Sequence, residues 1–260
     1  MIRFAVLASG SKANATVVEA FGFRILIDCG LSLRELSKRL GVIGLEVKDL
    51  DALLITHFHS DHIKGAAALL DKQPLEVYAA KGFHHIASKA KAQILKPLIE
   101  FQLGSFNIVA MPLPHDDGGS FGFVISSDDQ NFVFATDLGY ATEDLCFALK
   151  TADATIIESN HDLEMLQACA YPHFIKERIR SAYGHLSNCQ SSHLLQTSLS
   201  SRCQQVVLAH LSERANHPFQ ALAQMRRTII TSVNVASQYE PSAWYSIAVA
   251  NSELPICANA

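Results

Sequence analysis

The chain has 260 residues, of which 49% are hydrophobic, and its formal net charge is −4 at pH 7. A chain of this length can bury roughly three quarters of its unfolded surface, so it needs no disulfide staples to fold. The slightly acidic balance excludes a strong overall attraction to nucleic acid or to an anionic membrane, although it is compatible with a local basic groove.

The cysteines and the first residues of the sequence predict the cellular compartment of the protein. Six cysteines are scattered along the chain without a C-x-x-C pair, so neither a zinc knuckle nor a thioredoxin motif is predicted. No signal peptide is visible, and no segment offers about 18 uninterrupted apolar residues for a membrane span. We therefore expect a soluble cytoplasmic protein with free thiols that does not act at a membrane.

Short apolar runs separated by turn residues dominate the first half of the chain, which is typical of β-strands. A capping-box spacing at Ser32 and Glu35 predicts a helix that continues through Leu40. Other helices are expected at residues 63–70 and 84–95. Strands are expected at residues 2–7, 16–19, 23–28, 51–56, 77–80, 106–112, 122–126 and 131–136.

The second half is more helical. Helices are expected at residues 143–150, 163–170, 174–182, 190–198 and 218–230, and strands at 154–158, 204–209, 233–238 and 244–249. No linker or repeat divides the chain, so we expect a single domain over residues 1–260, with a frayed tail from about residue 251. This order of elements favours a layered α/β sandwich over a regular βαβ alternation.

The motif H-x-H-x-D-H at residues 57–62 directly follows an apolar strand. Alternate residues of an extended segment point the same way, so His57 and His59 are expected to hold one metal ion together. A turn then directs Asp61 and His62 toward a second ion. Imidazole and carboxylate ligands suit Zn²⁺, Mn²⁺ or Fe²⁺. A histidine-rich surface turn is the alternative, but four such side chains at a strand end have no packing role.

This motif resembles the signature of the metallo-β-lactamase superfamily, whose fold is a four-layer αββα sandwich. Three later strand ends resemble the remaining metal-binding motifs of that superfamily: P-H-D-D at 114–117, T-D-L-G at 136–139 and A-H-L-S at 209–212. The resemblance implies two divalent metal ions with seven ligands between them. One ion is held by His57, His59, His115 and Asp137, and the other by Asp61, His62, Asp137 and His210.

Further blocks resemble the YycJ/WalJ-type subfamily, and the match runs from about residue 2 to residue 218. Lys12 and Ala13 depart from the smaller, glycine-like residues expected there. The resemblance implies a di-metal phosphodiesterase acting on nucleic acid, specifically a 5′-to-3′ DNA exonuclease, with a metal-bridging hydroxide as nucleophile. The blocks are A-S-G-S at 8–11 with Asn14, E-S-N-H-D at 158–162, M-L at 165–166, Y-P at 171–172, the basic run 176–180 and G-H-L-S-N at 184–188.

A similar histidine serves as general acid in nuclease branches of the superfamily such as tRNase Z, and His185 is the matching candidate here. Glu158 is expected to orient it, because carboxylates commonly orient functional imidazoles. The alternative is that His185 only caps a helix that begins near Ser187. The candidate catalytic residues are therefore Asp61, His185 and Glu158.

Several polar residues are expected around this centre, each with a plainer alternative. The resemblance places Asp28 behind a metal-binding histidine, although it could simply form a turn. Asn160 and His161 are candidate substrate contacts, or members of a loop network. Lys176 and Arg180 share a helix face and could receive phosphates, or could form a solvated face.

Two other functions remain open from the sequence. A small-molecule thioester or cyclic phosphodiester hydrolase would use the same metal centre, so the fold alone does not decide between substrates. Thioesterase branches carry a C-terminal cofactor-binding segment, which has no clear counterpart here. A non-catalytic binding protein would be expected to lose ligands, whereas all seven positions are filled. The expected partner is DNA, and the sequence does not set the oligomeric state.

Overall fold

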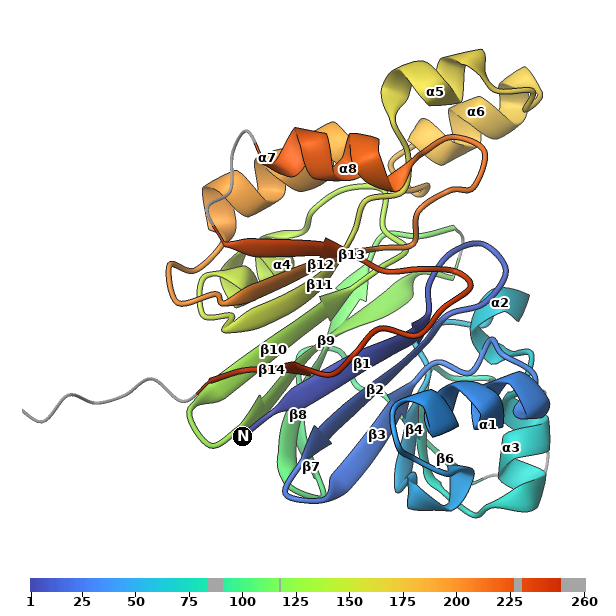
Figure 1. The fold of residues 1–260 in the computed structure, drawn as a ribbon, viewed down its shortest axis with the longest axis vertical. Helices are drawn as coiled ribbons and strands as arrows, with labels where there is room; N and C mark the ends of the chain where they lie inside the picture. Colours follow the sequence, from blue (N-terminus) through green and yellow to red (C-terminus); the bar gives the residue numbers. More distant parts are fainter. Residues whose placement is uncertain (84–90, 117, 227–230, 249–260) are drawn as a thin grey trace, which may run out of the picture.

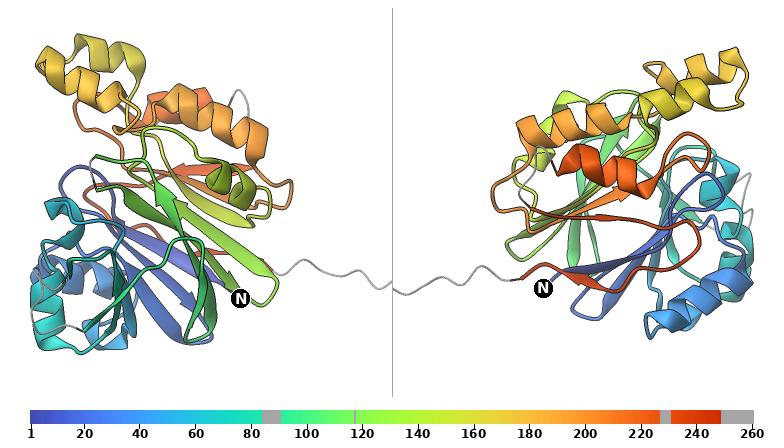
Figure 2. Two further views of the ribbon diagram at one scale, coloured as in Figure 1. Left: turned by 180° about the vertical axis from the view of Figure 1, so that it is seen from behind. Right: turned by 45° about the horizontal axis from the view of Figure 1, so that its top comes forward.

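In the computed structural model, the described residues are 1–83, 91–116, 118–226 and 231–248, and they form two seven-stranded sheets (Figures 1 and 2). The first sheet has the order β14 (Tyr245–Ser246), β1 (Arg3–Ala8), β2 (Ala15–Ala20), β3 (Phe23–Ile27), β4 (Ala52–Leu54), β5 (Glu76–Ala79) and β6 (Ala92–Ile94). The second has the order β13 (Ser232–Val235), β12 (Gln205–Ala209), β11 (Ala154–Glu158), β10 (Gln130–Ala135), β9 (Ser120–Ser127), β8 (Phe106–Leu113) and β7 (Glu100–Leu103).

Helices cover the outer faces of both sheets, which confirms the predicted α/β class and αββα layering (Figures 1 and 2). The first sheet carries α1 (Leu33–Val42), the 3-10 turn η1 (Val47–Asp49), α2 (Ser60–Ile63) and α3 (Ala66–Lys72). The second carries α4 (Glu143–Leu149), α7 (Asn188–Ser198) and α8 (Pro218–Met225), and α5 (Leu163–Ala168) and α6 (His173–Arg180) project beyond its end. Among the described residues, no helix is both long and apolar enough to cross a bilayer.

Three hydrophobic clusters fill the three interfaces of the sandwich. Neighbouring residues of one strand enter different clusters because successive side chains point to opposite faces. Phe132 of β10 packs between the two sheets, whereas Val133 packs under the helices of the second sheet. A strand buried on both faces is apolar throughout, which explains the uninterrupted apolar run at residues 132–135.

Both sheets change from antiparallel to parallel pairing along their width. In the first sheet β1, β2 and β3 are antiparallel and β3 to β6 are parallel. In the second, β7 to β10 are antiparallel and β10 to β13 are parallel. The parallel strands all end at the same edge of their sheet, so the loops that follow them meet there.

Two predicted helices differ from the structure. The helix expected at 63–70 is divided into α2 and α3 near Gly65, where a Cβ atom would lie 1.8 Å from the carbonyl oxygen of Leu31. The helix expected at 84–95 is wrong at residues 92–94, which pair with β5 as strand β6. Tertiary pairing overrides local propensity at such an edge strand. Residues 84–90, residues 227–230 of another expected helix, and the expected tail lie outside the described residues.

Candidate metal centre and active site

The seven predicted metal-binding side chains come together at the edge of the sandwich where the parallel strands end. The first sheet contributes His57, His59, Asp61 and His62, which follow β4. The second contributes His115 after β8, Asp137 after β10 and His210 after β12. Residues far apart in the sequence thus converge because each follows a strand that ends at this edge of the sandwich.

Left-handed backbone conformations mark the ends of β10 and β12, and also the end of β3. Asp28, Asp137 and His210 have φ angles of 60°, 60° and 57°. Such angles are uncommon for residues other than glycine and are retained where the surrounding structure requires them. Each of these residues turns the chain sharply as its strand ends, and its side chain takes part in the cluster.

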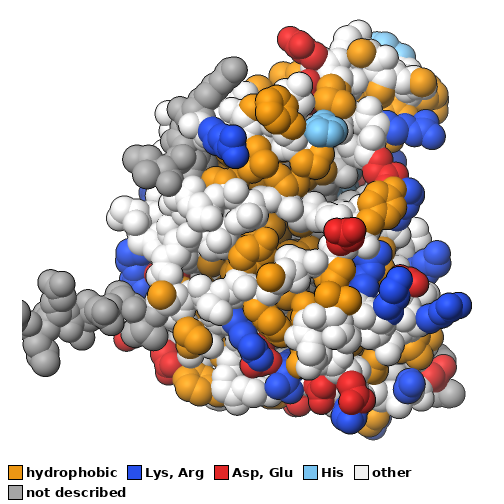
Figure 3. Space-filling view, viewed as in Figure 1, with side chains coloured by type: hydrophobic (Ala, Val, Ile, Leu, Met, Phe, Trp, Pro, Cys, Tyr) orange, Lys and Arg blue, Asp and Glu red, His pale blue; other side chains and the backbone are white. Residues whose placement is uncertain are grey.

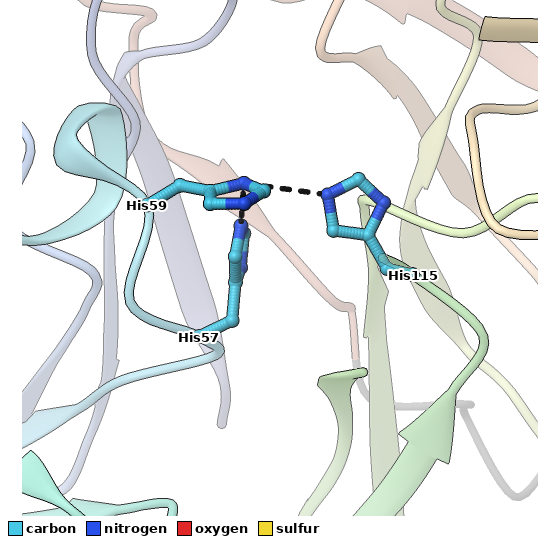
Figure 4. A group of neighbouring side chains, drawn as sticks. All are labelled: His57, His59 and His115. Carbon is cyan, nitrogen blue, oxygen red and sulfur yellow. Dashed lines mark hydrogen bonds between the residues drawn. The ribbon is translucent and has the colours of Figure 1, made fainter. Parts of the chain in front are cut away.

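Three imidazole rings form the first half of the centre (Figure 4). His57 Nε2 lies 2.9 Å from His59 Nδ1, and His115 Nε2 lies 3.4 Å from the same His59 atom. Burial lowers the pKa of His57 to about 2, so this ring is neutral and has a lone pair for a metal. Three ring nitrogens from three positions therefore converge on one point.

The second half combines carboxylates and imidazoles. His62 Nε2 lies 3.3 Å from Asp61 Oδ2 and 3.4 Å from Asp137 Oδ2, and His210 Nε2 lies 3.6 Å from Asp61 Oδ2. The other oxygen of Asp137 lies 3.8 Å from His115 Nε2 in the first half. Asp137 therefore lies between the two halves, as expected of a carboxylate that bridges two metal ions.

The ring nitrogens that face away from the centre each have a partner. His57 Nδ1 contacts Thr56 Oγ1 at 3.0 Å, and His115 Nδ1 contacts the Gly184 carbonyl at 3.1 Å. The remaining three contact carboxylates: His59 Nε2 to Asp116 at 3.0 Å, His62 Nδ1 to Asp28 at 2.7 Å and His210 Nδ1 to Glu158 at 2.9 Å. Partners of this kind orient a metal-binding imidazole and set its tautomer.

Two buried atoms at the centre lack a hydrogen-bond partner, namely Asp137 Oδ2 and His210 Nε2. Buried polar atoms are nearly always satisfied, so these two indicate a missing ligand. The donor set of imidazole nitrogens and carboxylate oxygens suits a divalent transition metal. The residues present therefore fit two divalent cations.

Glu158 connects the candidate metal-binding residues to the candidate general acid. This fully buried residue ends β11, and its Oε1 accepts hydrogen bonds from His185 Nδ1 and His210 Nδ1, both at 2.9 Å. Burial alone would raise the pKa of Glu158, but His185 and the other hydrogen-bonding groups lower it to about 2. The helix cap of α7 is Ser187, which accepts from the Gln190 N–H, so His185 is not needed as a cap.

Asp28 and Asn14 contact the carboxylate and imidazole groups of the second half of the centre. Asp28 accepts hydrogen bonds from the backbone and hydroxyl of Thr56 as well as from His62. Asn14 Nδ2 lies 3.1 Å from Asp61 Oδ2 and 3.0 Å from His62 Nε2. The β1–β2 loop therefore contacts the metal-binding residues directly.

The candidate substrate contacts mostly face other parts of the chain. Asn160 is buried and donates from its side chain to the His210 carbonyl at 2.8 Å, and His161 is also buried. Lys176 Nζ donates to the Gln167 carbonyl at 2.6 Å, and Arg180 donates to the Gln167 side chain at 3.0 Å. These contacts hold the 160–161 segment against the His210 loop and α6 against α5.

Asp116 was not predicted as a site residue, and it lies between the candidate metal centre and α6. Its carboxylate contacts His59 and also accepts two hydrogen bonds from Arg178, at 2.5 Å and 3.2 Å. The only signal in the sequence was its position beside His115. Arg178 thus reaches the centre, while its neighbours Lys176 and Arg180 face α5.

Comparisons with known proteins agree with this geometry. Residues 23–211 match the β-lactamase superfamily domain. The chain is 33% identical over 223 residues to the exodeoxyribonuclease WalJ of Streptococcus pneumoniae serotype 2, covering 82% of this chain and 83% of that protein. It is 31% identical to the exodeoxyribonuclease YycJ of Bacillus anthracis, covering 81% and 83%. The metallo-β-lactamase fold protein YhfI from Bacillus subtilis superimposes with a TM-score of 0.74 at 18% identity, covering 93% and 98%.

Proposed function

The chain belongs to the metallo-β-lactamase superfamily and is a metal-dependent hydrolase of that fold, and we propose that it degrades DNA from a strand end as a 5′-to-3′ exonuclease. The observation that carries this proposal is the link from His185 through Glu158 to His210, because it joins a proton donor to the metal-binding residues. The names of the two relatives support DNA as the substrate.

Two divalent cations, zinc or manganese or iron, would be held by the seven ligands. When bound, they supply Lewis acidity that polarises the phosphate and activates a water molecule at neutral pH. His57, His59 and His115 would hold one cation, and Asp61, His62 and His210 the other, with Asp137 between them.

The contribution of the chain itself is positioning and proton transfer. Because Glu158 holds His185 Nδ1, Nε2 is the nitrogen that can face the substrate. The side chain of His185 is 18% exposed, so a bound strand can reach it. Water adds its oxygen to phosphorus and loses one proton to the solvent, and the P–O bond to the leaving group breaks. His185 protonates the leaving oxygen and regains a proton from the solvent.

Replacing His185 with alanine tests this assignment. In the metal-loaded enzyme, His185→Ala is expected to lower kcat for DNA by about 10²- to 10⁴-fold, as for the loss of a general acid. The loss should be much smaller for a p-nitrophenyl phosphodiester, because p-nitrophenolate leaves without a proton. The matched control is His193→Ala, which removes an exposed histidine of α7.

Metal content is measured in each variant, so that loss of chemistry is separated from loss of metal. Full DNA cleavage by a metal-replete His185→Ala variant would contradict the proton-donor role. RNA and a thioester are included in the same assay. Turnover of the thioester with inert nucleic acids would contradict the proposed nuclease function.

We also propose a reducing, cytoplasmic location. The support is that the five cysteines in the described part of the chain, Cys29, Cys146, Cys169, Cys189 and Cys203, are free thiols.

A further inference from the structure

A pocket of about 310 Å³ opens beside the three-histidine half of the metal centre. This volume lies at the lower end of small-ligand pockets, so it suits one nucleotide rather than a duplex. We call it the terminal pocket. The metal centre forms one wall through His57, His59 and His115, and the described lining also includes Phe58, Lys81 and Asp116.

Phe58 gives the terminal pocket an aromatic wall. It stands between His57 and His59 in the sequence, and its half-buried ring packs against Phe83 with centroids 6.1 Å apart. A Cβ atom on Gly82 would lie 3.7 Å from the same ring, so the backbone also approaches it closely. A ring held in this way is a suitable stacking surface for a nucleobase.

Lys81 gives the terminal pocket a positive charge. It is exposed after β5, and its ammonium group makes no ion pair with any described carboxylate. Asp116, on the other wall, is already paired with Arg178 and His59. Positive and negative side chains are interspersed on the face shown in Figure 3. The chain has a net charge of −4, so binding a phosphate depends on local cations such as Lys81.

Taking the DNA substrate of the proposed function as given, we propose that the terminal pocket receives the last nucleotide of the strand being degraded. Phe58 stacks on its base, and Lys81 pairs with its phosphate. The adjoining phosphodiester then lies over the metal centre, because His57, His59 and His115 line the same pocket. The enzyme therefore releases single nucleotides, and it cleaves an end that carries a base faster than an end that lacks one.

Two oligonucleotides test the terminal pocket in the metal-loaded enzyme. One is an ordinary single strand, and the other lacks only the base at its cleaved end. Stacking of one base contributes about 1–3 kcal/mol, so wild type is expected to prefer the ordinary end by about 5- to 150-fold in kcat/KM. Phe58→Leu, which keeps the packing but loses the aromatic face, is expected to bring this preference close to one.

Lys81 is tested with the same substrates. Lys81→Ala is expected to raise KM for both ends by about tenfold, because one charge-assisted contact with the phosphate is lost. Lys81→Arg keeps the positive charge and is expected to restore most of the wild-type affinity. The controls are Phe147→Ala on α4, whose side chain is 72% exposed, and Lys72→Ala on α3. Both controls should keep the wild-type preference. Metal content and thermal unfolding are measured for every variant.

Equal cleavage of the two ends by wild type would overturn the proposal. So would full preference in a folded, metal-replete Phe58→Leu variant. If wild type cleaves no nucleic acid at all, the proposed function has failed, and calorimetry with a deoxynucleoside monophosphate then tests the pocket by itself. Weaker binding in Phe58→Leu and Lys81→Ala would support the pocket, and equal binding would overturn it.

Discussion

A histidine that binds a metal through one ring nitrogen is oriented by the group that holds the other nitrogen. At this centre three of the groups that hold the outer ring nitrogens are carboxylates, namely Asp116, Asp28 and Glu158. Asp116 is the most exposed of the three, with 27% of its side-chain surface accessible. It has a left-handed φ of 41° and is held in place by Arg178. Asp116, which also lines the terminal pocket, is therefore expected to position His59.

Asp116→Asn should weaken metal binding by about 10- to 100-fold, as is typical for the partner of a metal-binding histidine. Asparagine tolerates the left-handed backbone, so the change removes the charge without adding strain. Competition with a chelator measures the affinity. Asp128→Asn is the matched control, because Asp128 is also exposed and has a φ of 51°. Wild-type metal affinity in Asp116→Asn would contradict this role.

Metal uptake should release protons. Burial alone would lower the pKa of His62, but the charges of Asp137 and Asp28 raise it to about 10, and the pKa of His210 is also raised. The metal-free His62 ring is therefore protonated at pH 7, and a cation competes with that proton. We expect affinity to rise from pH 6 to pH 8. Calorimetry in two buffers with different ionisation heats should give different binding heats, and identical heats would contradict this.

The candidate metal ligands could be predicted from the sequence, whereas Asp116 could not. The cluster at 57–62 is recognisable because its ligands lie within one turn of chain. His115, Asp137 and His210 are recognisable because each ends an apolar strand. The contact of Asp116 with Arg178 joins residues 62 positions apart, and nothing local in the sequence indicates it.

At the scale of elements, three loops meet under the metal-binding turn. The backbone N–H of Asn14 donates to the Asp61 carbonyl at 2.8 Å, and that of Gly30 donates to the Asn14 carbonyl at 2.9 Å. A Cβ atom on Gly30 would lie 1.7 Å from the Asp61 oxygen and 2.8 Å from the Asn14 nitrogen. Only glycine allows the β1–β2, β3–α1 and β4–α2 loops to approach this closely.

Gly30→Ala is expected to lower the free energy of unfolding by about 1–3 kcal/mol, as overpacking does, and to reduce the metal content. Gly41→Ala in α1 is the control, because a Cβ there meets nothing within 4 Å. That change should leave stability equal or higher, since alanine favours helix by about 1 kcal/mol over glycine. Thermal unfolding with metal analysis checks both. A Gly30→Ala protein as stable and metal-rich as wild type would contradict the close-approach explanation.

Sequence patterns predicted central elements better than edge elements. Buried strands such as β10 and β12 have short, uninterrupted apolar runs, which are typical of central strands. The edge strands β6 and β7 were not predicted, because part of each is exposed and only pairing with a neighbour defines it. The division between α2 and α3 depends on the approach of Leu31 to Gly65, which is a tertiary contact.

At the scale of the whole molecule, the two sheets repeat one plan, with antiparallel strands followed by parallel strands, and the candidate metal ligands are divided between them. Bound cations therefore connect the two sheets and should stabilise the fold. At a metal concentration 100 times Kd the gain is about 2.7 kcal/mol. For a chain of this size, that is a rise of about 5–10 °C in Tm.

Calorimetric unfolding with saturating metal and with a chelator measures this difference. His210→Ala, which removes a ligand of the second sheet, should respond much less to the chelator. An identical Tm for the wild-type protein in both conditions would contradict the coupling of the two sheets.

The division of ligands between the sheets also has a consequence for synthesis. A ribosome makes the H-x-H-x-D-H turn early, but Asp137 comes later and His210 only when about four fifths of the chain exists. A nascent fragment that ends before His210 lacks one of the candidate ligands of the second cation. We therefore expect the candidate metal site, and any activity that depends on it, to be absent until most of the chain has been translated.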